Sequence, residues 1–236
     1  RDVAELIRAG FFVTVQLGVL GFLVASVVGL VLGVLSALNQ NGWLDYVGVF
    51  FATVGAALPN FVLASFLIVL FAVQFPIFRV LGWGGPLHLS DVLDPGAWDL
   101  KKLVLPVIAV STLPAAYIAR VTRASMLEVL HQDYIRTAHA KGLTEQIVII
   151  RHAVKNAMIP VLTVMGPIAA VLVTGSFIIE TVFSIPGVGR AFVDAVIRRD
   201  YAMIMGSTLF YTAVVAFANL TVDLLYAVVD PRIRYR

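Results

Sequence analysis

Five long stretches without a formal charge constrain this chain more than any other feature. Two of them, of 36 and 33 residues, lie on either side of Asp45, and runs of 17, 24 and 22 residues cover 103–119, 156–179 and 201–222. A helix crosses a bilayer with about 20 apolar residues. We therefore expect an all-α, polytopic membrane protein. Its five predicted spans cover residues 11–38, 47–75, 103–119, 157–183 and 203–229.

The composition excludes the other broad classes of protein. Charged residues make up 13% of the chain, whereas soluble domains carry about 25%. The long runs are apolar on every face, while the strands of membrane barrels alternate apolar and polar residues. Without cysteine there is no disulfide or thiolate chemistry. The 17 basic residues are scattered over the loops, which argues against a nucleic-acid partner.

Small residues and prolines predict how the spans pack and where they break. A small residue every fourth position lets two helix backbones approach closely, and the first span contains Gly21, Ala25, Gly29, Gly33 and Ala37. Broken helices that line a cavity are typical of transporters. The predicted breaks lie at Pro59 and Asn60 in the second span, Pro106 and Pro114 in the third, and Pro160 and Pro167 in the fourth.

Three polar segments, 76–102, 120–156 and 184–202, separate the later spans. In the last of them, Gly187–Phe192 starts like a dinucleotide-binding fingerprint but lacks its third glycine and follows a span instead of a strand. We interpret it as a turn. Nine basic residues lie on the side of segment 120–156 and eight on the other. This count does not by itself decide the orientation in the membrane.

No motif for enzyme chemistry is present. The chain has no zinc-protease, serine-hydrolase or phosphate-loop signature, so we predict no catalytic, cofactor-binding or metal-binding residue. The histidines His131, His139 and His152 are interpreted as solvated loop residues. Glu180 and Asp223 lie near span ends, where we expect them to reach the interface or to pair with an arginine. A membrane-embedded enzyme that uses these groups, or an autonomous channel, remains as an alternative of another class.

Segment 120–156 has the sequence RVTRASMLEVLHQDYIRTAHAKGLTEQIVIIRHAVKN and the pattern of a helix–turn–helix. Asp133 is a candidate N-cap of a short helix that ends at Lys141, and Gly142 supplies the left-handed stop that helices favour. Thr144 can cap a second helix that continues into the fourth span. We expect a partner to approach the small residues Ala138, Ala140 and Gly142 closely, with hydrogen bonds from Arg136, Lys141 and Arg151.

This segment resembles the cytoplasmic loop of permease subunits of binding-protein-dependent ABC importers. Arg136–Ala138 stands where that family has Glu-Ala-Ala, and Gly142 matches the family's glycine. His152 and Val154-Lys155 depart from the general pattern. Arg151–Asn156 is instead similar to the dipeptide and oligopeptide branch, as are the strings at Glu180–Tyr201 and Asn219–Arg236.

The resemblance implies a single permease domain over residues 1–236, of the type I ABC importer fold, with a sixth span in the full-length family and segment 120–156 in the cytoplasm. It implies a second homologous permease subunit, two cytoplasmic ATPase subunits that bind ATP and Mg²⁺, and an extracytoplasmic binding protein. Peptides are the implied substrate, with nickel, glutathione or another small solute as alternatives. The membrane lipid is a further expected partner, with location in the cell membrane.

The resemblance also assigns residues. Those expected to couple the permease to the ATPase are Asp133, Tyr134, Arg136, Thr137, Ala138, Ala140, Lys141, Gly142 and Leu143. Polar residues that we expect on the translocation path are Asn60, Thr163 and Ser176.

Overall fold

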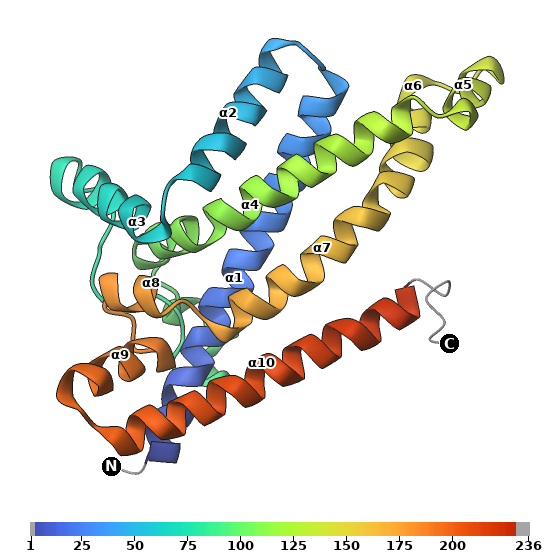
Figure 1. Cartoon of the computed structure of the whole chain (residues 1–236). Coiled ribbons are helices and arrows are strands. Elements are labelled where there is room, and N and C mark those ends of the chain that lie inside the picture. Colours follow the sequence, from blue (N-terminus) through green and yellow to red (C-terminus); the bar gives the residue numbers. More distant parts are fainter. Residues whose placement is uncertain (1–2, 230–236) are drawn as a thin grey trace. The chain divides into compact units, whose positions relative to one another are not determined.

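In the computed structural model, which describes residues 3–229, every regular element is helical (Figure 1). The long helices are α1 Val3–Leu38, α4 Leu100–Leu130, α7 Lys155–Thr174 and α10 Tyr201–Val229. The shorter α-helices are α2 Trp43–Ala57, α3 Asn60–Ile68, α5 Asp133–Ala140, α6 Glu145–Ile147, α8 Phe177–Val182 and α9 Val188–Arg198. Two π-helical segments, η1 Val69–Gln74 and η4 Val148–Val154, and two 3₁₀ turns, η2 Leu89–Asp91 and η3 Pro95–Ala97, complete this part of the chain.

The helices confirm the predicted membrane architecture. Among the described residues, four helical stretches are long and apolar enough to cross a bilayer: Val3–Leu38, Leu100–Leu130, Glu145–Val182 and Tyr201–Val222. A fifth span results if the bent pair Trp43–Ala57 and Asn60–Gln74 counts as one. The break at Pro59 is therefore confirmed.

The other predicted proline breaks are wrong. Helix α4 runs without interruption through Pro106 and Pro114, and α7 runs through Pro160 and Pro167. Neighbouring helices and local adjustments satisfy the carbonyl groups that a proline frees, so membrane helices tolerate it. The fourth predicted span is interrupted instead at Gly175, whose φ of +96° ends α7.

The chain divides into two compact units. Unit 1 contains the residues up to Phe22, Pro59–Ser111 and the residues from Pro167 on, and unit 2 contains Leu23–Leu58 and Thr112–Gly166. In unit 1, Val13, Leu17, Leu105, Ile179 and Phe183 are among the fully buried side chains of the largest core. The core of unit 2 gathers Ala37, Met126, Ile135, Ala138, Val148, Ala153 and Ala157.

The small-residue stripe of α1 packs closely against another helix, as predicted, and this helix is α4. In unit 2, a side chain at Gly29 would collide with Ile118, and one at Gly33 would collide with Thr122. In unit 1, Gly21 lies equally close to Val110. The stripe is therefore a helix-packing face, because each of these glycines leaves room for a side chain or carbonyl group of the neighbouring helix.

Candidate functional site

The short helix α5 stands beyond the ends of α4 and α7 in unit 2 (Figure 1). It begins at Asp133, one residue after the backbone cap Gln132, so the predicted cap position is wrong by one residue. Gly142 follows the helix with a φ of +77°, which confirms the predicted left-handed stop. Thr144 is the N-cap of α6 by its extended backbone, but its side chain makes no capping hydrogen bond.

One face of α5 anchors the helix to unit 2. Ile135 and Ala138 are buried in the core of this unit, together with Met126 of α4 and Val148 of η4. The prediction that Ala138 faces a partner is therefore wrong, because its methyl group is covered by the chain's own residues. Tyr134 adds a hydrogen bond, since its hydroxyl accepts from the Asn156 side chain at 3.1 Å.

The opposite face of α5 and the following turn are exposed. Apart from Ala138, all the residues expected to couple to the ATPase are exposed, namely Asp133, Tyr134, Arg136, Thr137, Ala140, Lys141, Gly142 and Leu143. Arg136 makes only a loose ion pair with Asp133, at 3.8 Å, in which both side chains are largely solvated. Such a pair contributes little to stability, so the Arg136 guanidinium can bind another protein at little cost to α5.

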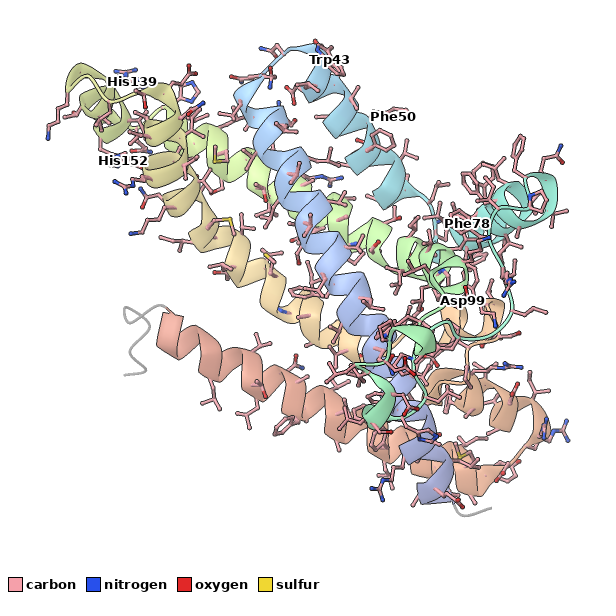
Figure 2. All side chains as sticks on the ribbon, turned by 180° about the vertical axis from the view of Figure 1, so that it is seen from behind. Trp43, Phe50, Phe78, Asp99, His139 and His152 are labelled. Carbon is pink, nitrogen blue, oxygen red and sulfur yellow. The ribbon has the colours of Figure 1, made fainter. Side chains whose placement is uncertain are left out.

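The histidines of this region are placed largely as expected. His131 and His139 are exposed, and Nδ1 of His131 lies 2.6 Å from the Leu127 carbonyl oxygen. His152 is half-buried on η4. Figure 2 shows His139 and His152 at the same end of unit 2. Among the residues with described side chains, no three of His, Asp and Glu lie close enough together to hold a metal ion.

The residues predicted on the translocation path occupy three different local environments. Asn60 is half-buried at the start of α3, and Ser176 caps α8, its hydroxyl accepting from the Ile179 N–H at 3.4 Å. Both belong to unit 1, in which α3 packs against α8. Thr163 is exposed on α7 in unit 2, and its hydroxyl donates to the Ile159 carbonyl. Their role in translocation stays a prediction.

A buried ion pair in unit 2 was missed by sequence analysis. Asp45, in the first turn of α2, is 4% exposed. Its Oδ1 accepts from Arg123 Nε at 2.6 Å and from the Ser36 hydroxyl, and its Oδ2 accepts from Arg123 Nη2 at 2.7 Å and from the Asn41 N–H at 3.0 Å. By sequence alone, both charges lie in segments between predicted spans. Their separation of 78 positions gives no local signal.

A second buried carboxylate lies in unit 1. Glu180 is 0% exposed, so the expectation that it reaches the interface is wrong. Its Oε1 accepts from the Thr14 hydroxyl at 3.0 Å and its Oε2 from the Arg190 N–H at 3.1 Å, while the Thr14 oxygen accepts from the Val188 N–H. Thr14 and Glu180 thus cap the N-terminus of α9, whose own N-cap, Gly187, has no side chain to do so. The side chain of Asp223 lies outside the described residues.

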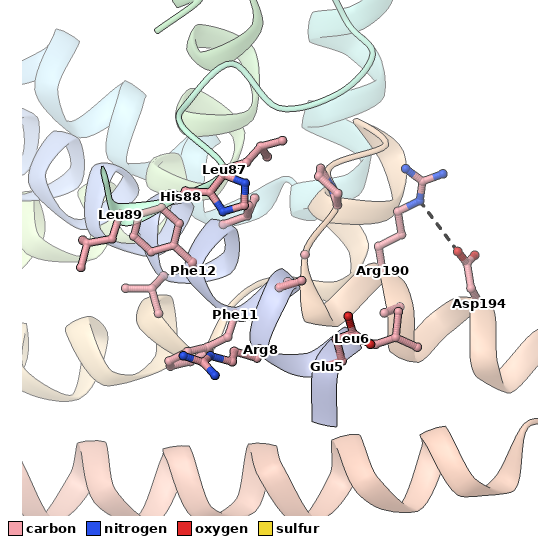
Figure 3. Close-up of a pocket in the computed structure, with 17 residues that line it drawn as sticks. Glu5, Leu6, Arg8, Phe11, Phe12, Leu87, His88, Leu89, Arg190 and Asp194 are labelled. Carbon is pink, nitrogen blue, oxygen red and sulfur yellow. Dashed lines mark ion pairs between the residues drawn. The ribbon is translucent and has the colours of Figure 1, made fainter. Parts of the chain in front are cut away.

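A pocket in unit 1 has a volume of about 940 Å³ (Figure 3). It lies between the start of α1, the segment 87–89 and the first half of α9. Phe11, Phe12 and Leu87 contribute apolar walls, and Arg190 and Asp194, 3.9 Å apart, form an ion pair at one side.

The comparisons with known proteins agree with this architecture. Residues 29–235 match the family described as the binding-protein-dependent transport system inner membrane component. The chain is 45% identical, over 99% of its length and 71% of the relative's, to the dipeptide transport system permease protein DppB of Bacillus subtilis. It is 43% identical, over 99% of its length and 72% of the relative's, to the oligopeptide transport system permease protein OppB of Salmonella typhimurium.

Solved structures show the same fold at low sequence identity. A chain of an amino acid ABC transporter crystallised with histidines aligns with a TM-score of 0.69 at 16% identity, covering 98% of this chain and 95% of that one. A chain of the inward-facing MetNI methionine ABC transporter aligns with a TM-score of 0.71 at 16% identity, covering 96% and 97%. The chain has the fold of a type I ABC importer transmembrane domain, and it belongs to the family of inner membrane components of binding-protein-dependent transport systems.

Proposed function

We propose that this chain is a permease subunit that moves dipeptides or oligopeptides across the membrane. In this proposal an extracytoplasmic binding protein delivers the peptide, a second homologous permease completes the path, and two cytoplasmic ATPases bind ATP and Mg²⁺ and drive the cycle. The 45% identity to a dipeptide permease over 99% of the chain carries the assignment of the substrate class.

In the same proposal, α5 is the element that docks into an ATPase. The support is its division into two faces: Ile135 and Ala138 lie in the core of unit 2, while Arg136, Thr137 and Lys141 are exposed. A helix held on one side and open on the other transmits a push to the helices that hold it. Coupling needs contacts that differ between the two states of the ATPase, and a rigid docked helix can convert such a difference into a rotation of the spans.

Co-purification tests the proposed assembly. The tagged full-length protein, extracted in mild detergent from its native host, should bring down two ATPase subunits and a second membrane subunit of similar sequence. Reconstituted with its binding protein, this complex should take up radiolabelled trialanine only when ATP is supplied. Purification of the chain alone, or uptake without ATP, would contradict the proposal.

Gly142→Trp tests the role of α5. A Cβ at Gly142 would meet no atom within 4 Å, and the left-handed backbone adds a strain of about 1–2 kcal/mol. We expect normal membrane insertion but at least a tenfold loss of ATP-driven trialanine uptake, because the indole ring occupies the surface that an ATPase would contact. Uptake is measured per inserted molecule in proteoliposomes.

Gly82→Trp is the matched control for this substitution. Gly82 also has a positive φ, of +90°, with no atom within 4 Å of an added Cβ, but it belongs to unit 1 and not to the α5 region. It carries the same backbone strain and the same bulk. If both variants lose uptake equally, or if Gly142→Trp keeps the parent's uptake, α5 is not the docking element.

A further inference from the structure

The Asp45–Arg123 pair is built to fix an orientation. Two parallel N–H donors of the guanidinium meet the two carboxylate oxygens, at 2.6 and 2.7 Å. A two-point contact of this kind fixes the direction of both side chains, whereas a single contact leaves them free to rotate. The Ser36 hydroxyl and the Asn41 N–H occupy the remaining positions around the carboxylate. Donors from α1, from the turn before α2 and from α4 thus converge on one group.

The helices around the pair approach each other closely. A Cβ at Gly33 of α1 would collide with Thr122, the residue before Arg123, and a Cβ at Gly48 of α2 would lie 3.2 Å from the Ser36 Cβ. Contact at these glycines sets the distances between α1, α2 and α4. The ion pair adds a contact that resists sliding of α2 along α4, which packing of small residues alone resists weakly.

The pair lies next to the anchor of α5. Met126, three residues after Arg123 on α4, is fully buried in the cluster that holds Ile135 and Ala138 of α5. Ala37, the neighbour of Ser36 on α1, belongs to the same cluster. Arg123 is therefore about one helical turn from the point where α5 contacts α4. A displacement of α5 reaches Arg123 through a short, densely packed stretch of unit 2.

We propose that Arg123 is a positioning residue for transport: through Asp45 it ties α2 to α4, so that α2 follows when α5 moves. This inference rests on the proposed function, because it assumes that α5 receives the motion of an ATPase. Without the pair, a push on α5 would displace the end of α4 and leave α2 behind. ATP would still be hydrolysed, but less of the motion would reach the spans.

Stability alone is a weak explanation for the pair. Replacing a buried ion pair by apolar residues of similar volume often leaves a protein as stable as before, or more stable. An apolar pair would also fill the space between α2 and α4 and hold them together. Such a pair lacks the directional contact, so the two explanations predict different results for the same double variant.

The test uses the complete reconstituted transporter with its binding protein and radiolabelled trialanine. Arg123→Lys keeps the charge but loses the two-point geometry, and Asp45→Leu with Arg123→Met replaces the pair by apolar side chains. For both, the uptake of trialanine per ATP hydrolysed should fall at least tenfold, with basal ATP hydrolysis of the assembled complex within twofold of the parent. Arg79→Gln is the control, because its ion pair with Asp99, at 3.3 Å, is solvent-exposed and belongs to unit 1.

Three outcomes would overturn the positioning role. The apolar double variant could couple ATP hydrolysis to uptake as well as the parent does, which would make the pair purely structural. Arg123→Lys could keep the parent ratio, which would make the two-point geometry irrelevant. Both variants could fail to assemble, which would make the pair a requirement for folding. If the parent itself shows no ATP-dependent uptake, the proposed function fails instead, independently of these variants.

Discussion

The two carboxylates that are buried among the described residues, Asp45 and Glu180, are held in opposite ways. Asp45 in unit 2 meets the guanidinium of Arg123, a charged group that reaches it on a long side chain. Glu180 in unit 1 meets the Thr14 hydroxyl and the backbone N–H of Arg190, while the guanidinium of Arg190 is directed elsewhere, to the Ser184 carbonyl at 2.7 Å. One carboxylate is stabilised by a cation and the other by neutral donors at the start of a helix.

The difference explains why glycines lie directly against the carboxylate of Glu180. A backbone N–H group cannot extend toward an acceptor as a long side chain can. The backbone itself must therefore lie close to the Glu180 carboxylate. Added side chains at Gly187 and Gly189 would collide with this carboxylate, and one at Gly175 would collide with Thr14. Around Glu180 we therefore expect sensitivity to volume, and around Asp45 sensitivity to charge.

Gly187→Val tests the predicted sensitivity to volume around Glu180, and it should lower the free energy of unfolding most. The backbone of Gly187, with a φ of −95°, accepts any residue, so the cost is steric. The new side chain would displace the Glu180 carboxylate and the Thr14 hydroxyl together, leaving donors of α9 unpaired. Overpacking and the lost hydrogen bonds sum to about 4 kcal/mol.

Thermal unfolding of the purified transporter in detergent would measure this cost. Gly82→Val is the control for the added volume, because no atom lies within 4 Å of its Cβ. Its φ of +90° adds a backbone strain of about 1–2 kcal/mol that Gly187→Val does not have, so the midpoint of Gly187→Val should still be the lower of the two. Equal midpoints for Gly187→Val and the parent would show that the backbone approach to Glu180 is not needed.

Asp45→Asn tests the predicted sensitivity to charge around Asp45, and it should have the second-largest cost in stability. The carboxamide has almost the same volume, but its NH₂ group would face one of the donors that Asp45 now accepts from, and Arg123 would lose its counter-charge. Because the Arg123 side chain is 29% exposed, we expect a loss near the lower end for a broken buried pair, about 3 kcal/mol. The unfolding midpoint should recover in the apolar double variant of Asp45 and Arg123, and a midpoint that stays low there would contradict a charge effect.

The sequence predicted the features that depend on neighbouring residues. The charge-free runs identify the spans, since bilayer thickness alone sets the required length. Gly142 predicted the end of α5, because glycine adopts the left-handed backbone conformation that ends a helix without a steric cost. Helix α9 was missed within the polar segment 184–202. Its buried residues Val188 and Ala195, seven positions apart, are the helical signal that could have found it.

What the sequence did not predict depends on contacts between distant residues. Thr14 and Glu180 are 166 positions apart, and Asp45 and Arg123 are 78 apart. In the neighbouring sequence, Glu180 looks like any carboxylate near the end of a span. Asp45 and Arg123 look like ordinary charged residues of a loop. Ala138 shows the same limit within the candidate site: its small side chain predicted an exposed contact, but the packing of α5 on Met126 turns it inward.

Glu180→Gln should have the smallest effect and sharpens the comparison most. A glutamine can donate its NH₂ to the Thr14 oxygen and accept the Arg190 N–H with its carbonyl, so most of the present hydrogen bonds have an equivalent. No cation loses a partner, because the groups bound to Glu180 are neutral. We expect a loss of about 1 kcal/mol, near one third of that for Asp45→Asn. If the same amide substitution lowered the unfolding midpoint equally at both positions, the negative charge of Glu180 would matter as much as that of Asp45, and neutral donors would not suffice to explain its burial.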